Sequence, residues 1–224
     1  MRRYLTEYIG TFFLVLTICL TVQQKAALAP LAIGLVLAVM VYAGGHKSGA
    51  HYNPAVTVAV WLRGKLPARD VVPYISAQVL GSVTAAALAT AMLGGRPATP
   101  FAVGGKALVA AFVAELVVTF ALGYVVMNVA TSKKLDGNQF YGLAIGATVF
   151  AGAVAVGAIS GGVFNPAVAV GVSAAGMVSW SMLWVYMVAN VAGGALAAVA
   201  FRLLNPNDVA VEERAPKAAE ANAA

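Results

Sequence analysis

Six long apolar stretches limit most strongly what this chain can fold into. Each approaches or exceeds the length of about 20 residues that a helix needs to cross a membrane. Only 10% of the residues are charged, whereas a soluble domain carries roughly 25%, so lipid is the expected surrounding. We therefore predict an all-α membrane protein with six transmembrane helices, at residues 4–22, 29–45, 71–93, 107–130, 142–157 and 179–204.

The basic residues fall mainly on one side of the predicted spans. Eleven lie before the first span, in alternate connections or near the end of the chain, and three lie on the opposite side. Lys and Arg are enriched in cytoplasmic loops, so we expect a multi-pass protein of the inner cell membrane with both termini cytoplasmic. This placement accounts for the net charge of +6 without a nucleic-acid partner.

The tetrapeptide Asn-Pro-Ala-Val occurs twice, at 53–56 and again 112 positions later at 165–168. Many other residues match at nearly the same offset, which indicates a duplication. We predict a first repeat at 1–105, a second at 106–205, and a tail at 206–224 that is disordered in the cytoplasm. Because each repeat holds three spans, the copies are inverted, and inverted repeats commonly place their functional site near the membrane midplane.

Each copy of the tetrapeptide is expected to open a short helix, at 53–62 and at 165–174. Asn is a good N-cap, and Pro is favoured at the first helical position. About ten helical residues rise roughly 15 Å, half of the hydrocarbon core, so two such half-helices from opposite faces would meet at the midplane. The preceding Gly-rich backbone is tolerated at this depth along a wet cavity. We expect pore-lining carbonyls from Gly49, Ala50, His51, Gly161, Gly162 and Val163.

The sequence around each tetrapeptide carries further distinctive residues. It reads Ser-Gly-Ala-His-Tyr-Asn-Pro-Ala-Val-Thr at 48–57 and Ser-Gly-Gly-Val-Phe-Asn-Pro-Ala-Val at 160–168, with Glu7 placed early in the first span. These segments resemble the signature loops of the aquaporin or major intrinsic protein family, and the resemblance extends to Asn205. It implies the aquaporin fold, a pore for water and small neutral solutes in a lipid bilayer, and a homotetramer with one pore per subunit.

The predicted midplane combines two helix N-termini, each with about half an elementary positive charge. Such a centre raises the energy of cations, including a hydrated proton. The two Asn side chains are expected to donate to a passing water molecule, the prolines to set the entry angle of the helices, and the alanines to keep their crossing small. The midplane residues are Asn53, Pro54, Ala55, Asn165, Pro166 and Ala167.

Glu7 and Glu115 are the carboxylates expected deep within the spans. Buried ionisable groups in a membrane suggest function, so a proton relay in an ion-coupled secondary transporter is one interpretation. The other is structural: each carboxylate accepts hydrogen bonds from loop N–H groups, and Gln78 and Asn190 satisfy further loop groups. The symmetric placement favours the structural interpretation. We find no nucleophile–base pair, phosphate loop or sufficient metal ligands, and therefore predict no enzyme, cofactor or metal site.

The residue after the second Asn-Pro-Ala departs from the family pattern. Most members carry an Arg there, and this chain carries Val168. Alignment on the repeats gives an uncharged selectivity filter of Ile33, Ala153, Gly162 and Val168 without an aromatic ring. A wide filter is expected, which admits water and larger neutral solutes such as ammonia, urea, hydrogen peroxide, glycerol or metalloid acids. Refilling of this space by Phe150 or Phe164 is the opposing possibility.

Overall fold

A computed structural model describes residues 1–97 and 99–208, and within them the chain is mostly helical. Six helices are long and apolar enough to cross a membrane, the last of them together with the 3₁₀ turn η2 (Trp180–Met182). The predicted all-α fold is confirmed. The long helices are α1 (Arg2–Gln23), α2 (Ala29–Ser48), α4 (Ala68–Met92), α5 (Lys106–Thr131), α6 (Tyr141–Ser160) and α8 (Leu183–Leu204).

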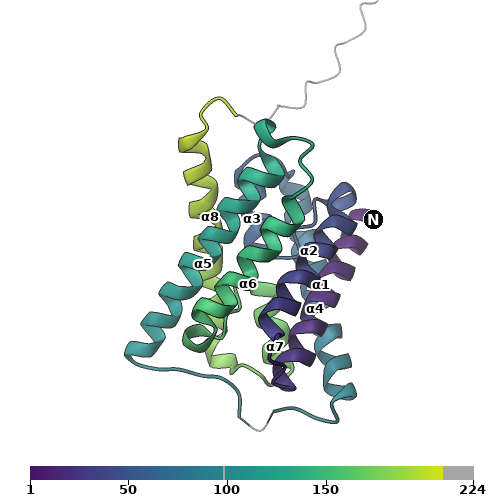
Figure 1. Ribbon diagram of the computed structural model, residues 1–224, viewed down its shortest axis with the longest axis vertical. Coiled ribbons are helices and arrows are strands. Elements are labelled where there is room, and N and C mark those ends of the chain that lie inside the picture. Colours follow the sequence, from purple (N-terminus) through teal and green to yellow (C-terminus); the bar gives the residue numbers. More distant parts are fainter. Residues whose placement is uncertain (98, 209–224) are drawn as a thin grey trace, which may run out of the picture.

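Two helices of nine residues each complete the described architecture. They are α3 (Pro54–Leu62) and α7 (Pro166–Ala174), and a 3₁₀ turn η1 (Lys133–Leu135) lies between α5 and α6. Figure 1 shows α3 in the half of the bundle where the chain begins and α7 in the opposite half. Helix α3 packs mainly on α8, and α7 packs mainly on α4. The two half-helices thus enter the bundle from opposite ends.

Glycines let the long helices approach one another closely. Gly34 of α2 and Gly146 of α6 face each other so tightly that a Cβ on either would overlap backbone or side-chain atoms of the other helix. A Cβ on Gly193 of α8 would stand 2.5 Å from the carbonyl oxygen of Leu116 in α5. Small residues at such crossings are typical of helices packed in lipid, and here they fix the frame around the half-helices.

The sequence predicts a disordered tail from residue 206, but the first residues after α8 have a defined place in the structure. Asp208 is buried, and its carboxylate accepts hydrogen bonds from the Ser132 hydroxyl at 2.8 Å and the Lys133 N–H at 3.0 Å. The guanidinium of Arg63, just after α3, lies 2.7 Å from the same carboxylate. A buried carboxylate needs such partners. These bonds hold Asp208 against the bundle, so residues 206–208 are part of the folded structure. Residues 209–224 of the predicted tail lie outside the described residues.

Candidate functional site

The two half-helices meet through their N-cap residues. The side-chain oxygen of Asn53 accepts from the Ala55 N–H at 2.8 Å, and that of Asn165 accepts from the Ala167 N–H at 2.9 Å. Each side-chain amide also donates across the junction, Asn53 to the Phe164 carbonyl and Asn165 to the Tyr52 carbonyl, both at 2.8 Å.

An Asn amide carries two N–H donors, so this junction uses one donor of each side chain. Both Asn residues also line the cavity described below. The second donor of each amide therefore has a place to meet a solute. Pro54 and Pro166 occupy the first helical positions, where their missing N–H groups leave no unpaired donor.

The residue before each Asn has an unusual backbone conformation. Tyr52 and Phe164 both have φ of 50°, the left-handed region that bulky side chains rarely adopt. Glu7 stabilises this conformation in the first repeat, because its carboxylate accepts from the Tyr52 N–H at 2.7 Å and the His51 N–H at 3.0 Å. Glu115 accepts equivalently from the Phe164 N–H at 2.7 Å and the neighbouring Val163 N–H at 2.9 Å.

The polar network is fuller in the first repeat than in the second. Gln78 donates to Glu7 at 2.8 Å and to the Thr57 hydroxyl at 2.9 Å. At the equivalent place, Asn190 accepts from the Thr119 hydroxyl at 3.1 Å, and its buried Nδ2 finds no partner among the described residues. Asn is one methylene shorter than Gln, and Ala169 at the place of Thr57 offers no hydroxyl to accept a hydrogen bond. Each loop nevertheless donates the same two N–H groups to its carboxylate. The expectation that Gln78 and Asn190 satisfy loop groups is wrong for these contacts, because both bond side chains behind the loops.

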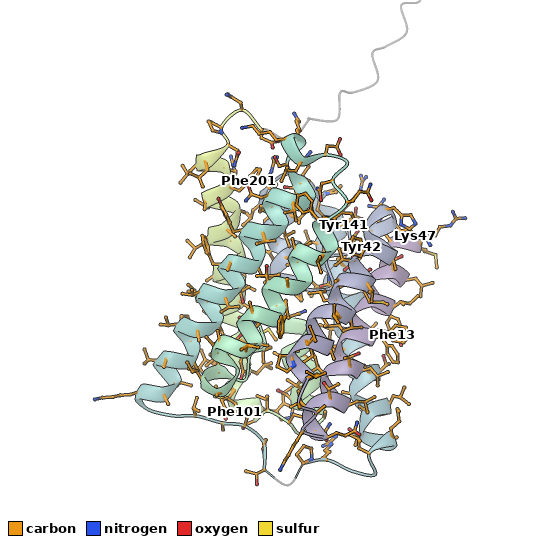
Figure 2. The ribbon with its side chains drawn as sticks, viewed as in Figure 1. Phe13, Tyr42, Lys47, Phe101, Tyr141 and Phe201 are labelled. Atoms are coloured by element: carbon orange, nitrogen blue, oxygen red, sulfur yellow. The ribbon has the colours of Figure 1, made fainter. Side chains whose placement is uncertain are left out.

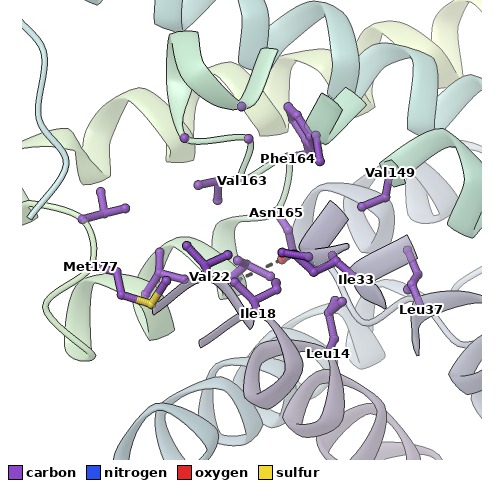
Figure 3. Close-up of a pocket in the computed structure, with 18 of the residues that line it drawn as sticks. Leu14, Ile18, Val22, Ile33, Leu37, Val149, Val163, Phe164, Asn165 and Met177 are labelled. Carbon is purple, nitrogen blue, oxygen red and sulfur yellow. Dashed lines mark hydrogen bonds between the residues drawn. The ribbon is translucent and has the colours of Figure 1, made fainter. Parts of the chain in front are cut away.

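A cavity of about 820 Å³ runs from the Asn pair to the end of the bundle opposite the N-terminus, and we call it the distal cavity. Figure 3 shows Leu14, Ile18 and Val22 of α1 and Ile33 of α2 among its apolar walls, with Asn165 at its inner part. The predicted filter residues Ile33, Ala153, Gly162 and Val168 all line this cavity, as do Gly161 and Val163.

A second cavity of about 630 Å³ extends to the end where the chain begins, and we call it the proximal cavity. Gly49 lines only the proximal cavity. Four residues line both cavities, namely Ala50, His51, Val126 and Ile145. The two cavities therefore adjoin at this ring of residues. Basic side chains surround the proximal cavity, from Arg3, Lys47, Lys65 and Lys133.

Glu7 and Glu115 are fully buried, and neither belongs to the lining of the two cavities in the described part of the chain. Their carboxylate oxygens are occupied by the loop N–H groups and by the hydroxyls of Ser48 and Ser160, each at 2.7 Å. A carboxylate that relays protons with a solute would need access to it. This geometry favours the structural interpretation of both residues.

Of the two aromatic residues that the sequence suggested could refill the filter space, only one lines the cavity. Phe164 lines the distal cavity, whereas Phe150 packs beside Gly34 between α2 and α6 and does not belong to the lining. Phe101, which sequence analysis did not single out, lines the distal cavity from the connection between α4 and α5. It lies in an irregular segment without a repeat partner, so no periodicity or motif could have pointed to it.

The model of one protein family, described as "Major intrinsic protein", matches residues 1–201. This chain belongs to the major intrinsic protein family. Among family relatives, it is 37% identical to "Aquaporin Z" of Rhodopseudomonas palustris, over 95% of this chain and 97% of that one. It is also 37% identical to "Glycerol uptake facilitator protein-like 6" of Lactiplantibacillus plantarum, over 93% of this chain and all of the relative.

Other members of the family show the same relationship. "Aquaporin NIP1-1" of Oryza sativa subsp. japonica is 37% identical, with 91% of this chain and 74% of that protein covered. Among solved structures, the aquaglyceroporin from Plasmodium falciparum matches 92% of this chain and 97% of that one. Its TM-score is 0.76 at 20% identity, a likeness that supports the shared fold.

Proposed function

We propose that this protein is a passive transmembrane channel for water and small uncharged solutes. The observation that carries the proposal is the pair of adjoining cavities, with two helix N-termini and two Asn amides facing the distal cavity. The lining of the distal cavity includes no carboxylate among the described residues. Relatives whose names denote water channels and glycerol facilitators support the same class of function. No enzymatic activity or cofactor is proposed.

Ion exclusion is proposed to reside at the Asn53–Asn165 junction. Each half-helix presents about half an elementary positive charge there, and a free amide N–H on each side favours the oxygen of a neutral solute. A water molecule that accepts from both amides must point its hydrogens away from the junction. This orientation interrupts a continuous hydrogen-bonded file, so protons are excluded together with other cations.

Solute choice is proposed to depend on the filter Ile33, Ala153, Gly162 and Val168. These side chains are apolar or absent and offer neither a positive charge nor an aromatic ring. Such a filter replaces little of a solute's hydration shell, and it leaves room for solutes wider than water. Ammonia, urea, hydrogen peroxide, glycerol and undissociated metalloid acids fit this description.

The chain is proposed to consist of two inverted repeats, 1–105 and 106–205, in the inner cell membrane with both termini cytoplasmic. The N-terminus and the end of α8 lie at the same end of the bundle in Figure 1, and most basic residues belong to this end. The distal cavity then opens outside the cell and the proximal cavity inside. By analogy with the family, four copies would assemble with one pore each.

Stopped-flow light scattering on proteoliposomes tests the channel proposal. Channel flux should exceed that of protein-free vesicles, persist without any ion gradient and show a low activation energy. Strict dependence on a proton or sodium gradient would reject the channel in favour of ion-coupled transport through Glu7 or Glu115. A panel of water, urea, glycerol and hydrogen peroxide on the same vesicles then ranks the solutes.

A further inference from the structure

The connection between α4 and α5 is bonded to the segment that follows α7. The Phe101 N–H donates to the Met177 carbonyl at 2.8 Å, and the Ser179 N–H donates to the Phe101 carbonyl at 2.9 Å. Phe101 and Val178 form an isolated parallel β-bridge. Two backbone hydrogen bonds on one residue fix its position within an otherwise irregular connection.

Phe101 lies at the outer part of the distal cavity, next to the filter. Phe101 lines the distal cavity together with Gly161 and Gly162. Its ring atom Cδ1 lies 3.6 Å from the point where a Cβ on Gly161 would stand, so the ring lies beside this glycine. Figure 2 shows Phe101 at the end of the bundle opposite Phe201. Lys25 and Arg96 line the distal cavity at this same end. The ring is thus packed against the loop that carries one filter position.

The other aromatic residues of this cavity lie at the filter or behind it, and the ring of Phe164 reaches the filter position Gly162. Tyr52 and Phe164 directly precede the two N-cap Asn residues and are almost fully buried. Phe101 is half-buried and belongs to the outer connection. It is therefore the aromatic side chain of the described lining that a solute meets before the filter. A Phe side chain covers on the order of 150–250 Å², so its presence changes the width of the entrance substantially.

We propose that Phe101 is a size-selecting residue of the pore entrance, an inference that rests on the proposed channel function. The ring supplies the aromatic bulk that the filter positions lack, and the bridge to residues 177–179 holds it in place. Slender solutes such as water, urea and glycerol pass the ring. Bulkier polyols are retained at the entrance, although the apolar filter behind it would admit them.

The test compares the permeability of a five-carbon polyol, ribitol, with that of water in proteoliposomes. Phe101→Ala removes the whole ring and should raise the ribitol-to-water ratio by at least about tenfold, the lower end of the discrimination that one methylene gives in an apolar pocket. Phe101→Trp should lower the glycerol-to-water ratio. Phe13→Ala is the matched control, because Phe13 is 44% exposed on α1 and absent from the cavity lining.

A second pair of variants tests the bridge while the ring is kept. Ser179 has φ of −66°, which suits proline, so Ser179→Pro removes the N–H that bonds Phe101 with little other strain. Ser179→Ala keeps that N–H and loses only the hydroxyl contacts. We expect a raised ribitol-to-water ratio in Ser179→Pro and an unchanged ratio in Ser179→Ala.

An unchanged ribitol ratio in both Phe101→Ala and Ser179→Pro, with water flux retained, would overturn the role of Phe101. Phe101→Leu keeps apolar packing and should raise the ratio less than Phe101→Ala, which separates selection from misfolding. The channel proposal fails separately, when wild-type vesicles conduct neither water nor urea faster than protein-free vesicles.

Discussion

The guanidinium of Arg63 lies 2.7 Å from the carboxylate of Asp208, and both side chains are almost completely enclosed. The pair joins the end of half-helix α3 to the segment after α8, and Ser132 bonds the second carboxylate oxygen. The Arg63 guanidinium also stacks 4.7 Å from the ring centre of Phe201. One end of the bundle is therefore held by a buried charge cluster that spans three separate parts of the chain.

Replacement of Asp208 by Ala should strongly destabilise the protein. The change leaves the Arg63 charge buried without its partner, a situation that costs roughly 3–5 kcal/mol. Thermal unfolding in detergent, followed by circular dichroism, measures the loss. Asp136→Ala is the control, because Asp136 is exposed in a neighbouring connection. Equal unfolding temperatures for the two variants would contradict a stabilising role of the pair.

The same cluster predicts a pH dependence of stability. Burial by itself raises the pKa of Asp208, but hydrogen bonds from Ser132 and Lys133 and the charge of Arg63 outweigh it and hold the pKa below its ordinary value of 3.8. The unfolded state therefore binds the proton more readily than the folded state. The stabilisation is complete above pH of about 3.8 and is lost as the pH falls through the lowered pKa.

The measurement is the difference in unfolding temperature between wild type and Asp208→Asn as a function of pH. This difference should stay constant from neutral pH down to about pH 5 and shrink in more acidic solution, where Asp208 of the wild type becomes protonated. A difference that shrinks already between pH 7 and pH 5 would assign the effect to other groups.

Glu7→Gln and Glu115→Gln should lower stability without creating or abolishing ion coupling. Each carboxylate accepts two loop N–H groups, and a hydrogen bond to a charged group contributes about 1.5–3 kcal/mol. The two variants should lose similar amounts, because each loop donates the same pair of N–H groups to its carboxylate. Water flux with and without a proton gradient, measured beside thermal unfolding, checks this. If flux in the wild type depends on the gradient and either variant abolishes this dependence, the result would support an ion-coupled transporter instead.

Sequence patterns predicted the parts of this structure that depend on local chemistry and on repetition. Asn53 and Pro54 mark a helix start by capping preference alone, and the recurrence at Asn165 relates the two halves. The Arg63–Asp208 pair and the position of Phe101 depend on contacts between residues far apart in the chain. Neither falls in a repeated or periodic segment, so only the three-dimensional arrangement could identify them.

Val168→Arg should convert the pore to a narrower and more water-selective one. Val168 is 3% exposed and lines the distal cavity, so an Arg there adds both bulk and positive charge to the filter. We expect glycerol and urea permeability to fall by about tenfold relative to water. Val168→Leu adds bulk without charge and separates the two effects. An unchanged solute panel in Val168→Arg would remove Val168 from the filter.

Cation exclusion at the entrance should depend on Lys25 and Arg96. Both are exposed and line the distal cavity, whose described lining includes no carboxylate. A cleft lined by one sign of charge concentrates its field and repels ions of that sign, which partly replaces the charge missing at Val168. Lys25→Gln combined with Arg96→Gln should raise sodium leak roughly tenfold at low salt, and the increase should diminish at high salt because exposed charges are screened.

Lys106→Gln removes a charge from the same end without touching the cavity lining and should leave the leak unchanged. A sodium leak in the double variant no larger than in Lys106→Gln would assign cation exclusion to the Asn53–Asn165 junction alone.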